Sequence, residues 1–147
     1  MDIQAGNMIS QIKRVSDRIF DHILSEREID AFNGAQGRIL YVLWQEENIS
    51  LKEIAGRTGL AATTLTSMID RMEALGLVCR VSDCSDRRKT LLALTDKARS
   101  LKKDYDAVSS QMSGIVYAGF SKEEIVQCEA MLGRIYDNLR QYGQIPS

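Results

Sequence analysis

The sequence predicts a mostly helical, α+β fold that contains one small β-hairpin. Three observations support this fold class. Apolar residues recur every three or four positions near both ends of the chain, which is typical of long amphipathic helices. Two short helical segments meet at the turn Thr58-Gly59-Leu60, and two short apolar segments enclose the polar stretch 82–90. The expected order is therefore four helices, a hairpin and two more helices.

The first two helices are predicted from their apolar stripes. The N-terminal stripe extends its helix to about residue 30, and it comprises Ile9, Ile12, Val15, Ile19 and Ile23. Asn33-Gly34 then marks a turn. The stripe of the second helix fades at 46–48, and it comprises Ile39, Leu40, Leu43 and Trp44.

Two shorter helices are predicted between residues 50 and 76. The pattern Ser50-x-x-Glu53 is typical of a capping box, in which both side chains accept hydrogen bonds from backbone N–H groups. A further helix begins at Ala62, and Gly76 in the C′ position ends it. Its expected inward residues are Leu65, Met68 or Ile69, Met72 and Leu75.

The C-terminal part is predicted to contain a hairpin and two long helices. Residues 77–82 and 90–95 form the two strands. Thr95-Asp96 caps the next helix, and Ser121-x-x-Glu124 is a second capping box that opens the last one. Their apolar stripes comprise Leu101, Tyr105, Val108, Met112 and Ile115, then Ile125, Cys128, Leu132, Ile135 and Leu139.

The chain is expected to form one domain with three parts. These parts are an N-terminal dimerisation helix (1–32), a central helix-turn-helix and hairpin (33–96), and C-terminal dimerisation helices (97–147). The flanking apolar stripes are longer than one small domain needs. A second copy of the chain is therefore expected to cover them across a two-fold axis.

Composition excludes several classes of protein. Apolar residues make up 44% of the 147 residues and charged residues 27%, so a folded globular protein is expected. No apolar run approaches the ~20 residues of a membrane span, and a cytoplasmic location is expected. Cys79, Cys84 and Cys128 are an odd, scattered set that fits a reducing compartment. With His22 as the only histidine and no Cys-x-x-Cys pair, no metal or other cofactor is expected.

No enzyme is expected either. The sequence shows no nucleophile–base pair, no metal-binding cluster and no glycine-rich phosphate loop. The charge distribution points elsewhere. The whole chain has a net charge of −1, yet residues 50–90 carry seven Lys/Arg against five Asp/Glu, a balance of +2. Local positive charge of this kind favours a polyanionic partner.

The order of the central elements predicts a winged helix-turn-helix that binds double-stranded DNA. In such a fold the second helix enters the major groove. Its outward face comprises Ala61, Thr63, Thr64, Ser67 and Arg71. The hairpin, or wing, places an arginine beside the adjacent minor groove. Its candidate residues are Arg80, Asp86, Arg87, Arg88 and Lys89, with Asp86 paired to a neighbouring arginine. A merely solvated turn and helix face are the alternative.

Several segments resemble the MarR (multiple antibiotic resistance regulator) family of bacterial transcription factors. The matching segments are Ala35–Leu40, Leu51–Ala55, Ile69–Val78, Arg80 with Asp86–Arg88, and Leu92–Thr95. The resemblance implies a homodimeric repressor, or less often an activator, on a near-palindromic operator. It also implies that Asp86 and Arg88 are the wing-tip pair, with Arg88 in the minor groove. Ala98 departs from the glycine of many members, and the first helix lacks the cysteine of thiol-sensing members.

Regulation is open to more than one reading. Phe32, Tyr41 and Trp44 lie where the flanking helices meet the winged region, so a small aromatic or phenolic effector is expected there. Ordinary core packing is the alternative. Cys84 lies among cations that favour a reactive thiolate, which allows a thiol-sensing regulator. A winged-helix module that binds a protein partner instead of DNA is a further alternative. Cys128 and Cys79 are expected to be packed and inert.

Overall fold

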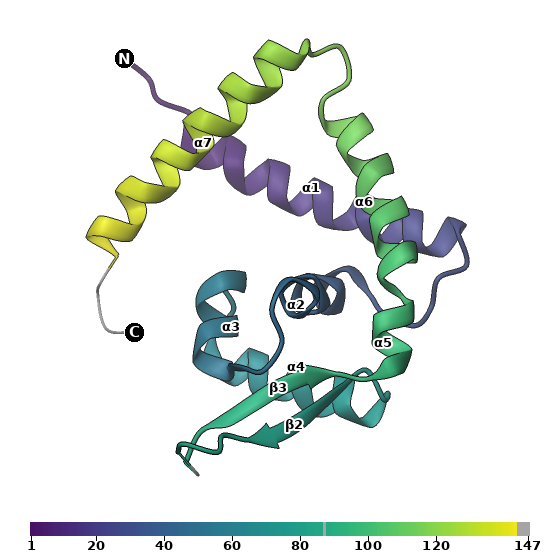
Figure 1. Ribbon diagram of the computed structural model, residues 1–147. Coiled ribbons are helices and arrows are strands. Elements are labelled where there is room, and N and C mark those ends of the chain that lie inside the picture. Colours follow the sequence, from purple (N-terminus) through teal and green to yellow (C-terminus); the bar gives the residue numbers. More distant parts are fainter. Residues whose placement is uncertain (87, 144–147) are drawn as a thin grey trace. The chain divides into compact units, whose positions relative to one another are not determined.

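The computed structural model describes residues 1–86 and 88–143. Its helices are α1 (Ala5–Glu26), α2 (Gly34–Gln45), α3 (Leu51–Thr58), α4 (Ala62–Ala74), α5 (Asp96–Ser100), α6 (Lys102–Val116) and α7 (Lys122–Tyr142). Its strands are β1 (Ile49–Ser50), β2 (Val78–Ser82) and β3 (Thr90–Leu94) (Figure 1). The chain forms two compact units, Met1–Ser110 and Gln111–Ser147. The predicted four helices followed by a hairpin are found, whereas three helices rather than the predicted two follow the hairpin.

The sheet of the first unit has three antiparallel strands in the order β1-β3-β2. In the hairpin, Val78 pairs with Leu94 and Ser82 pairs with Thr90. The third strand, β1, pairs Ile49 with Leu92 and was not predicted. Because β1 is only two residues long, it shows no alternation of apolar and polar residues from which a strand can be recognised.

The end of α4 corrects one prediction about the core. Gly76 adopts a left-handed φ of 75°, and its N–H donates to the Glu73 carbonyl while Leu77 N–H donates to Met72. This pair of bonds is a Schellman motif. It turns the chain so that Leu77 is fully buried, whereas Leu75 is 46% exposed. The prediction that Leu75 lies inward was therefore wrong, because the reversal places the next apolar residue in the core.

Helix caps agree with the sequence patterns in part. Ser50 Oγ accepts from Glu53 N–H at 3.2 Å, as the first capping box predicts. The Glu53 carboxylate instead accepts from Arg57 Nη2 at 2.7 Å, so the reciprocal half of this box is replaced by an ion pair. The second box, Ser121 with Glu124, is complete. Another complete box joins Asn33 to Gln36, where only a turn was predicted.

The helix after the wing is divided in two. Thr95 Oγ1 accepts from Ala98 N–H and caps α5, as predicted. The same hydroxyl donates to the Gly76 carbonyl at 2.6 Å, which fastens the end of the wing to the end of α4. Leu101 then separates α5 from α6, so the single long helix of the sequence prediction is interrupted there.

A cluster of aromatic side chains fills the junction between α1, α2 and α6. Tyr105 is its centre, and its ring centroid lies 5.1 Å from that of Trp44 and 5.7 Å from those of Phe20 and Tyr41. Phe32 lies at 6.3 Å. Burial raises the pKa of the Tyr105 hydroxyl. Tyr105 and the fully buried Val108 therefore pack within the first unit. This corrects the prediction that a second copy of the chain covers their part of the apolar stripe.

Glu47 joins the wing to α5. Its Oε1 accepts from Leu94 N–H at 2.9 Å and from Arg99 Nη2 at 2.9 Å. The bond from Arg99 is the main cause that holds the Glu47 pKa below its usual value, against the opposing effect of burial. Because the folded pKa is lowered, the stability that Glu47 contributes is present above its unfolded pKa and is lost as the pH falls through the lowered value.

Replacing Glu47 by alanine is expected to lower the free energy of unfolding at neutral pH by about 1–3 kcal/mol. The reason is that Leu94 N–H, on a strand residue that is only 4% exposed, loses its acceptor. Chemical denaturation of both proteins measures the difference, which should shrink as the pH is lowered through the Glu47 pKa. Asp96→Ala is the control, since it removes the other, fully exposed ion-pair partner of Arg99 and should cost less than about 1 kcal/mol. Equal losses from the two variants would contradict this role of Glu47.

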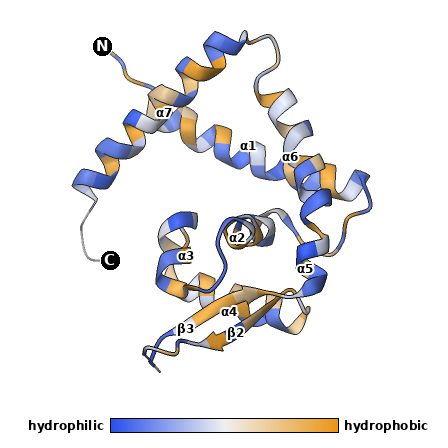
Figure 2. Cartoon of the chain, viewed as in Figure 1, coloured by the Kyte–Doolittle hydropathy of each residue, from blue (hydrophilic) through white to orange (hydrophobic). Residues whose placement is uncertain are grey.

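Large apolar surfaces remain uncovered on both units. None of the 21 residues of α7, all of them described, is buried. Figure 2 shows apolar and polar segments alternating along α7 and α1. The exposed apolar residues of α7 are Val126, Met131, Leu132, Ile135, Tyr136, Leu139 and Tyr142, and those of α1 are Met8, Ile9, Ile12 and Val15. Ile23, at the other end of α1, is buried, so only the first part of the predicted α1 stripe is uncovered. No helix in the described part of the chain is long and apolar enough to cross a membrane.

Candidate nucleic-acid interface

The helix-turn-helix consists of α3 and α4 joined by a tight turn at Gly59. Gly59 adopts a left-handed φ of 73°, which suits glycine at the end of a helix. Thr58 Oγ1 donates to the Ile54 carbonyl at 2.7 Å, so this side chain is bonded to the last turn of α3. One side of α4 is fixed to the core, because Leu65, Ile69 and Met72 are at most 1% exposed. The opposite side of α4 is therefore left to solvent.

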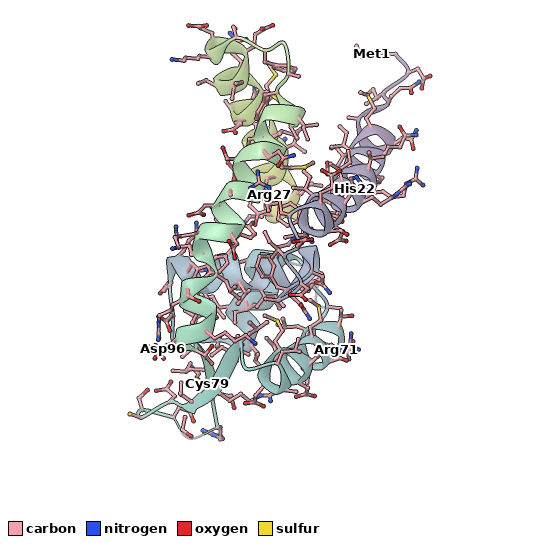
Figure 3. All side chains as sticks on the ribbon, turned by 90° about the vertical axis from the view of Figure 1, so that its right-hand side faces the viewer. Met1, His22, Arg27, Arg71, Cys79 and Asp96 are labelled. Atoms are coloured by element: carbon pink, nitrogen blue, oxygen red, sulfur yellow. The ribbon has the colours of Figure 1, made fainter. Side chains whose placement is uncertain are left out.

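All five residues predicted for the recognition face are exposed. These residues are Ala61, Thr63, Thr64, Ser67 and Arg71. Figure 3 shows Arg71 on the outer side of α4. Thr66 is different, because its hydroxyl donates to the Ala62 carbonyl at 2.9 Å. The exposed face thus carries hydroxyl groups and one guanidinium, which are groups that hydrogen-bond to bases and phosphates.

The first turn of α4 also favours an anion. Its N-cap is Ala61, whose side chain has no acceptor for the first backbone N–H groups of the helix. The turn holds no acidic residue, so the partial positive charge of the helix terminus is not compensated locally. A DNA phosphate that approaches the recognition face meets this terminus.

The wing tip, residues 83–89, is shaped by two aspartates. Asp83 Oδ1 accepts from Ser85 N–H at 2.9 Å and from its hydroxyl at 2.8 Å, and the bond from the backbone is the main cause that lowers the Asp83 pKa. Asp86 Oδ1 accepts from Arg88 N–H at 3.0 Å and lies 3.6 Å from Arg88 Nε. The predicted pairing of Asp86 with a neighbouring arginine is thus found. These bonds involve the backbone of the loop, and they leave the side chains of Arg88 and Lys89 exposed.

The two described cations of the wing tip extend into solvent. The Arg88 side chain is 94% exposed, and Lys89 is exposed as well. Arg87, which was predicted to contact DNA beside them, lies outside the described residues. Two described cations therefore occupy the end of a hairpin whose strand β2 packs beside α4.

Arg80 occupies a different position from the other predicted wing residues. Its Nη2 donates to Asp70 Oδ1 at 2.6 Å, and its Nη1 donates to Glu73 Oε1 at 2.7 Å. The bond to Asp70 is the main cause that raises the Arg80 pKa. The structure therefore directs Arg80 toward α4. Sequence reasoning missed this pairing because Asp70 and Arg80 are on different elements and no local spacing relates them.

The three cysteines lie in three environments. Cys84 is exposed on the wing tip, as predicted. Cys79 is partly covered on β2, where its thiol lies 3.8 Å from the Ala93 carbonyl. Cys128 was predicted to be core, but it is only partly covered on α7, and it lines a shallow groove with residues such as Phe120 and Leu132. The prediction for Cys128 was wrong because the apolar side of α7 has no cover within its own unit.

The predicted effector residues Phe32, Tyr41 and Trp44 all pack against Tyr105. An open hollow of about 370 Å³ adjoins this cluster on the side of Phe32, a volume within the usual range for small ligands. Its other lining residues are Asp21, Leu24, Ser25, Ile29, Asp30, Asn33 and Gln36. Tyr41 and Trp44 are not among them, so the structure brings the three rings together but lines this hollow with only one.

Sequence comparisons relate the central part of the chain to known transcriptional regulators. The family model described as the MarR family matches residues 32–90. The HTH-type transcriptional regulator TtmR of Methylorubrum extorquens (strain PA1) is 43% identical over 77 residues, which cover 52% of this chain and 40% of that protein. The match thus spans less than half of that relative's length.

Two solved structures extend the likeness to most of the chain. A mutant MarR from E. coli, complexed with operator DNA, has a TM-score of 0.80 at 22% identity over 90% of this chain and 94% of that chain. A MarR transcriptional regulator from Methanosarcina mazei Go1 has a TM-score of 0.83 at 20% identity, covering 94% of this chain and 97% of that chain. These likenesses confirm the predicted winged-helix fold class.

Proposed function

We propose that the chain, whose residues 32–90 match the model of the MarR family, is a sequence-specific, DNA-binding transcriptional regulator that acts as a homodimer. One observation carries this proposal. The hydroxyl-rich face of α4 and the cations of the wing tip are both exposed on one winged-helix unit. Groups that bind phosphates and base edges are thus presented by two neighbouring elements of a fold that is also found in an operator complex.

The two elements suit two grooves of the duplex. The recognition face of α4 enters the major groove, where Thr64, Ser67 and Arg71 contact base edges and phosphates. The wing tip lies along the adjacent minor groove, with Arg88 inserted where the groove is narrow and electronegative. Asp86 keeps the Arg88 backbone in place and limits the orientations of the guanidinium.

The exposed apolar faces support the homodimer. An unpaired surface with as many large apolar side chains as α7 is typical of a protein–protein interface. A second copy of the chain supplies a matching surface without any further partner. Two recognition helices then contact two half-sites, so the operator is nearly palindromic.

Regulation by a small molecule is part of the same proposal. The hollow beside Phe32 adjoins the aromatic cluster that connects α1 and α6 to the winged helix through α2. A small aromatic or phenolic ligand that binds there releases a repressor from its operator only if it prefers the conformation that cannot bind DNA. The exposed thiol of Cys84 on the wing tip favours a second candidate, in which oxidation of that thiol has the same effect.

The proposal is tested by a mobility-shift titration of the protein with DNA from the region upstream of its own gene. Saturable binding at physiological salt that survives an excess of unrelated duplex is expected. A module that binds a protein partner would show no such affinity, and the winged-helix surface would then need another ligand. Repeating the titration with a phenolic compound library, and separately with a mild oxidant, distinguishes the two modes of regulation.

Alanine at Thr64 or Ser67 is expected to change sequence preference. Each substitution should alter the relative affinity for operator variants by about 1 kcal/mol, the net worth of one hydrogen bond, because both residues lie on the exposed face of α4. Selection from randomised duplexes measures the preference. Lys89→Ala is the matched control, since loss of a phosphate contact weakens binding to all sequences alike. If selection returned the wild-type consensus for both α4 variants, Thr64 and Ser67 would not contact base edges.

A further inference from the structure

We propose that Arg80 controls DNA affinity indirectly, by holding the carboxylates of Asp70 and Glu73, and that it does not itself contact DNA. This inference rests on the proposed DNA-binding function. It reverses the sequence-based assignment of Arg80 to the DNA-contacting residues of the wing. Arg80 is then a positioning residue, whose effect on DNA passes through α4.

The position of Arg80 on β2 explains its orientation. Side chains of a strand alternate between its two faces, so Arg80 shares a face with Val78. Val78 is only 2% exposed, which places this face against the core and α4. The Arg80 side chain is 29% exposed, and its two terminal nitrogens are both engaged by carboxylates of α4.

The two carboxylates matter because they belong to the proposed recognition helix. Asp70 lies one helical turn after Ser67 and next to Arg71 in the sequence, and its side chain is 64% exposed. An uncompensated carboxylate at this place repels the DNA phosphates. The guanidinium of Arg80 pairs with both Asp70 and Glu73 and offsets half of their combined charge, so the recognition helix reaches DNA with its acidic groups paired.

The same contacts fix α4 to the strand that leads to the wing tip. A guanidinium presents its donors in a rigid plane, and here that plane joins two residues of α4 to one residue of β2. Lysine carries a point charge and cannot reproduce this fork. The recognition helix and the wing are therefore held at one relative position through Arg80.

A double-mutant cycle tests the proposal with the intact protein and its operator duplex. Dissociation constants are measured by fluorescence anisotropy for wild type, Arg80→Ala, Asp70→Asn with Glu73→Gln, and all three substitutions together. Arg80→Ala alone is expected to weaken binding about tenfold, a typical coupling for groups in direct contact. In the background without the carboxylates, the same substitution is expected to weaken binding by no more than about twofold, within the range for uncoupled sites.

Arg88→Ala is the matched control, because Arg88 pairs with Asp86 and not with α4. Its effect should be the same in both backgrounds. An equal loss from Arg80→Ala in both backgrounds would show that Arg80 contacts DNA directly, and would overturn the inference while leaving the proposed function intact. Absence of any operator binding by wild type would overturn both. If Arg80→Ala unfolds below the assay temperature, Arg80→Lys replaces it in the double-mutant cycle. Lysine keeps the positive charge but cannot donate to both carboxylates from one rigid plane.

Discussion

Aspartate at both Leu132 and Ile135 is expected to convert the protein from a dimer to a monomer and to lower operator affinity by at least about a hundredfold. The two side chains are 49% and 38% exposed within one chain, and both line the shallow groove on α7. In the proposed dimer they are covered by the second copy. Burying two unpaired carboxylates there costs far more than such an interface gains.

The large effect on DNA follows from geometry. A dimer places two recognition helices on one duplex, so the second half-site is bound at a high effective concentration. A monomer binds one half-site only and loses that gain without losing any residue that contacts DNA. Sedimentation equilibrium measures the oligomeric state, and an anisotropy titration with operator duplex measures the affinity.

A matched control separates the interface from added charge. Ala130→Asp with Gly133→Asp adds the same two charges on the other side of α7, where an added Gly133 side chain meets no atom within 4 Å. This variant should remain a dimer. Circular dichroism establishes that both variants keep their helices. A wild-type protein that sediments as a folded monomer at micromolar concentration would contradict the homodimer.

Replacing Arg88 by alanine is expected to weaken operator binding by about 1–3 kcal/mol, which is roughly five- to 150-fold. The Arg88 side chain is 94% exposed and makes few contacts within its own chain, so it is free to enter a groove. For the same reason the melting temperature should change little. Anisotropy titrations at several salt concentrations measure the affinity and its dependence on salt. The slope of the logarithm of the binding constant against the logarithm of the salt concentration should decrease in magnitude by about one, because one fewer counterion is released.

Lys103→Ala is a suitable control for Arg88→Ala, since it removes one exposed cation from α6 and leaves the wing intact. Its effect on binding should be much smaller. Equal affinities for wild type and Arg88→Ala at physiological salt would mean that the wing tip does not read the minor groove.

Much of the fold was predictable because its signals are local. The apolar stripe of α4 selects Leu65, Ile69 and Met72 for the core, and this choice also determines which residues form the recognition face. Capping patterns and Gly76 located several helix ends for the same reason, since a cap is decided within about one helical turn.

What could not be predicted depends on contacts between distant segments. Strand β1 exists only because Ile49 pairs with Leu92. The pairing of Arg80 with Asp70 and Glu73 was missed because these two carboxylates lie on another element. Tyr105 was assigned to a dimer face, yet four aromatic rings from α1, α2 and the segment between them surround it. In each case a contact between segments that are distant in the sequence determines the position of the residue, and no short sequence pattern indicates that contact.

The central claim is that α4 and the wing read DNA as part of a symmetric pair. Hydroxyl-radical footprinting of the wild-type protein on its operator tests it most directly. Two protected segments are expected, centred about 10 base pairs apart or slightly more, each flanked by protection of the minor groove that disappears with Arg88→Ala. Uniform protection without half-sites, or a footprint that Arg88→Ala leaves unchanged, would contradict the account.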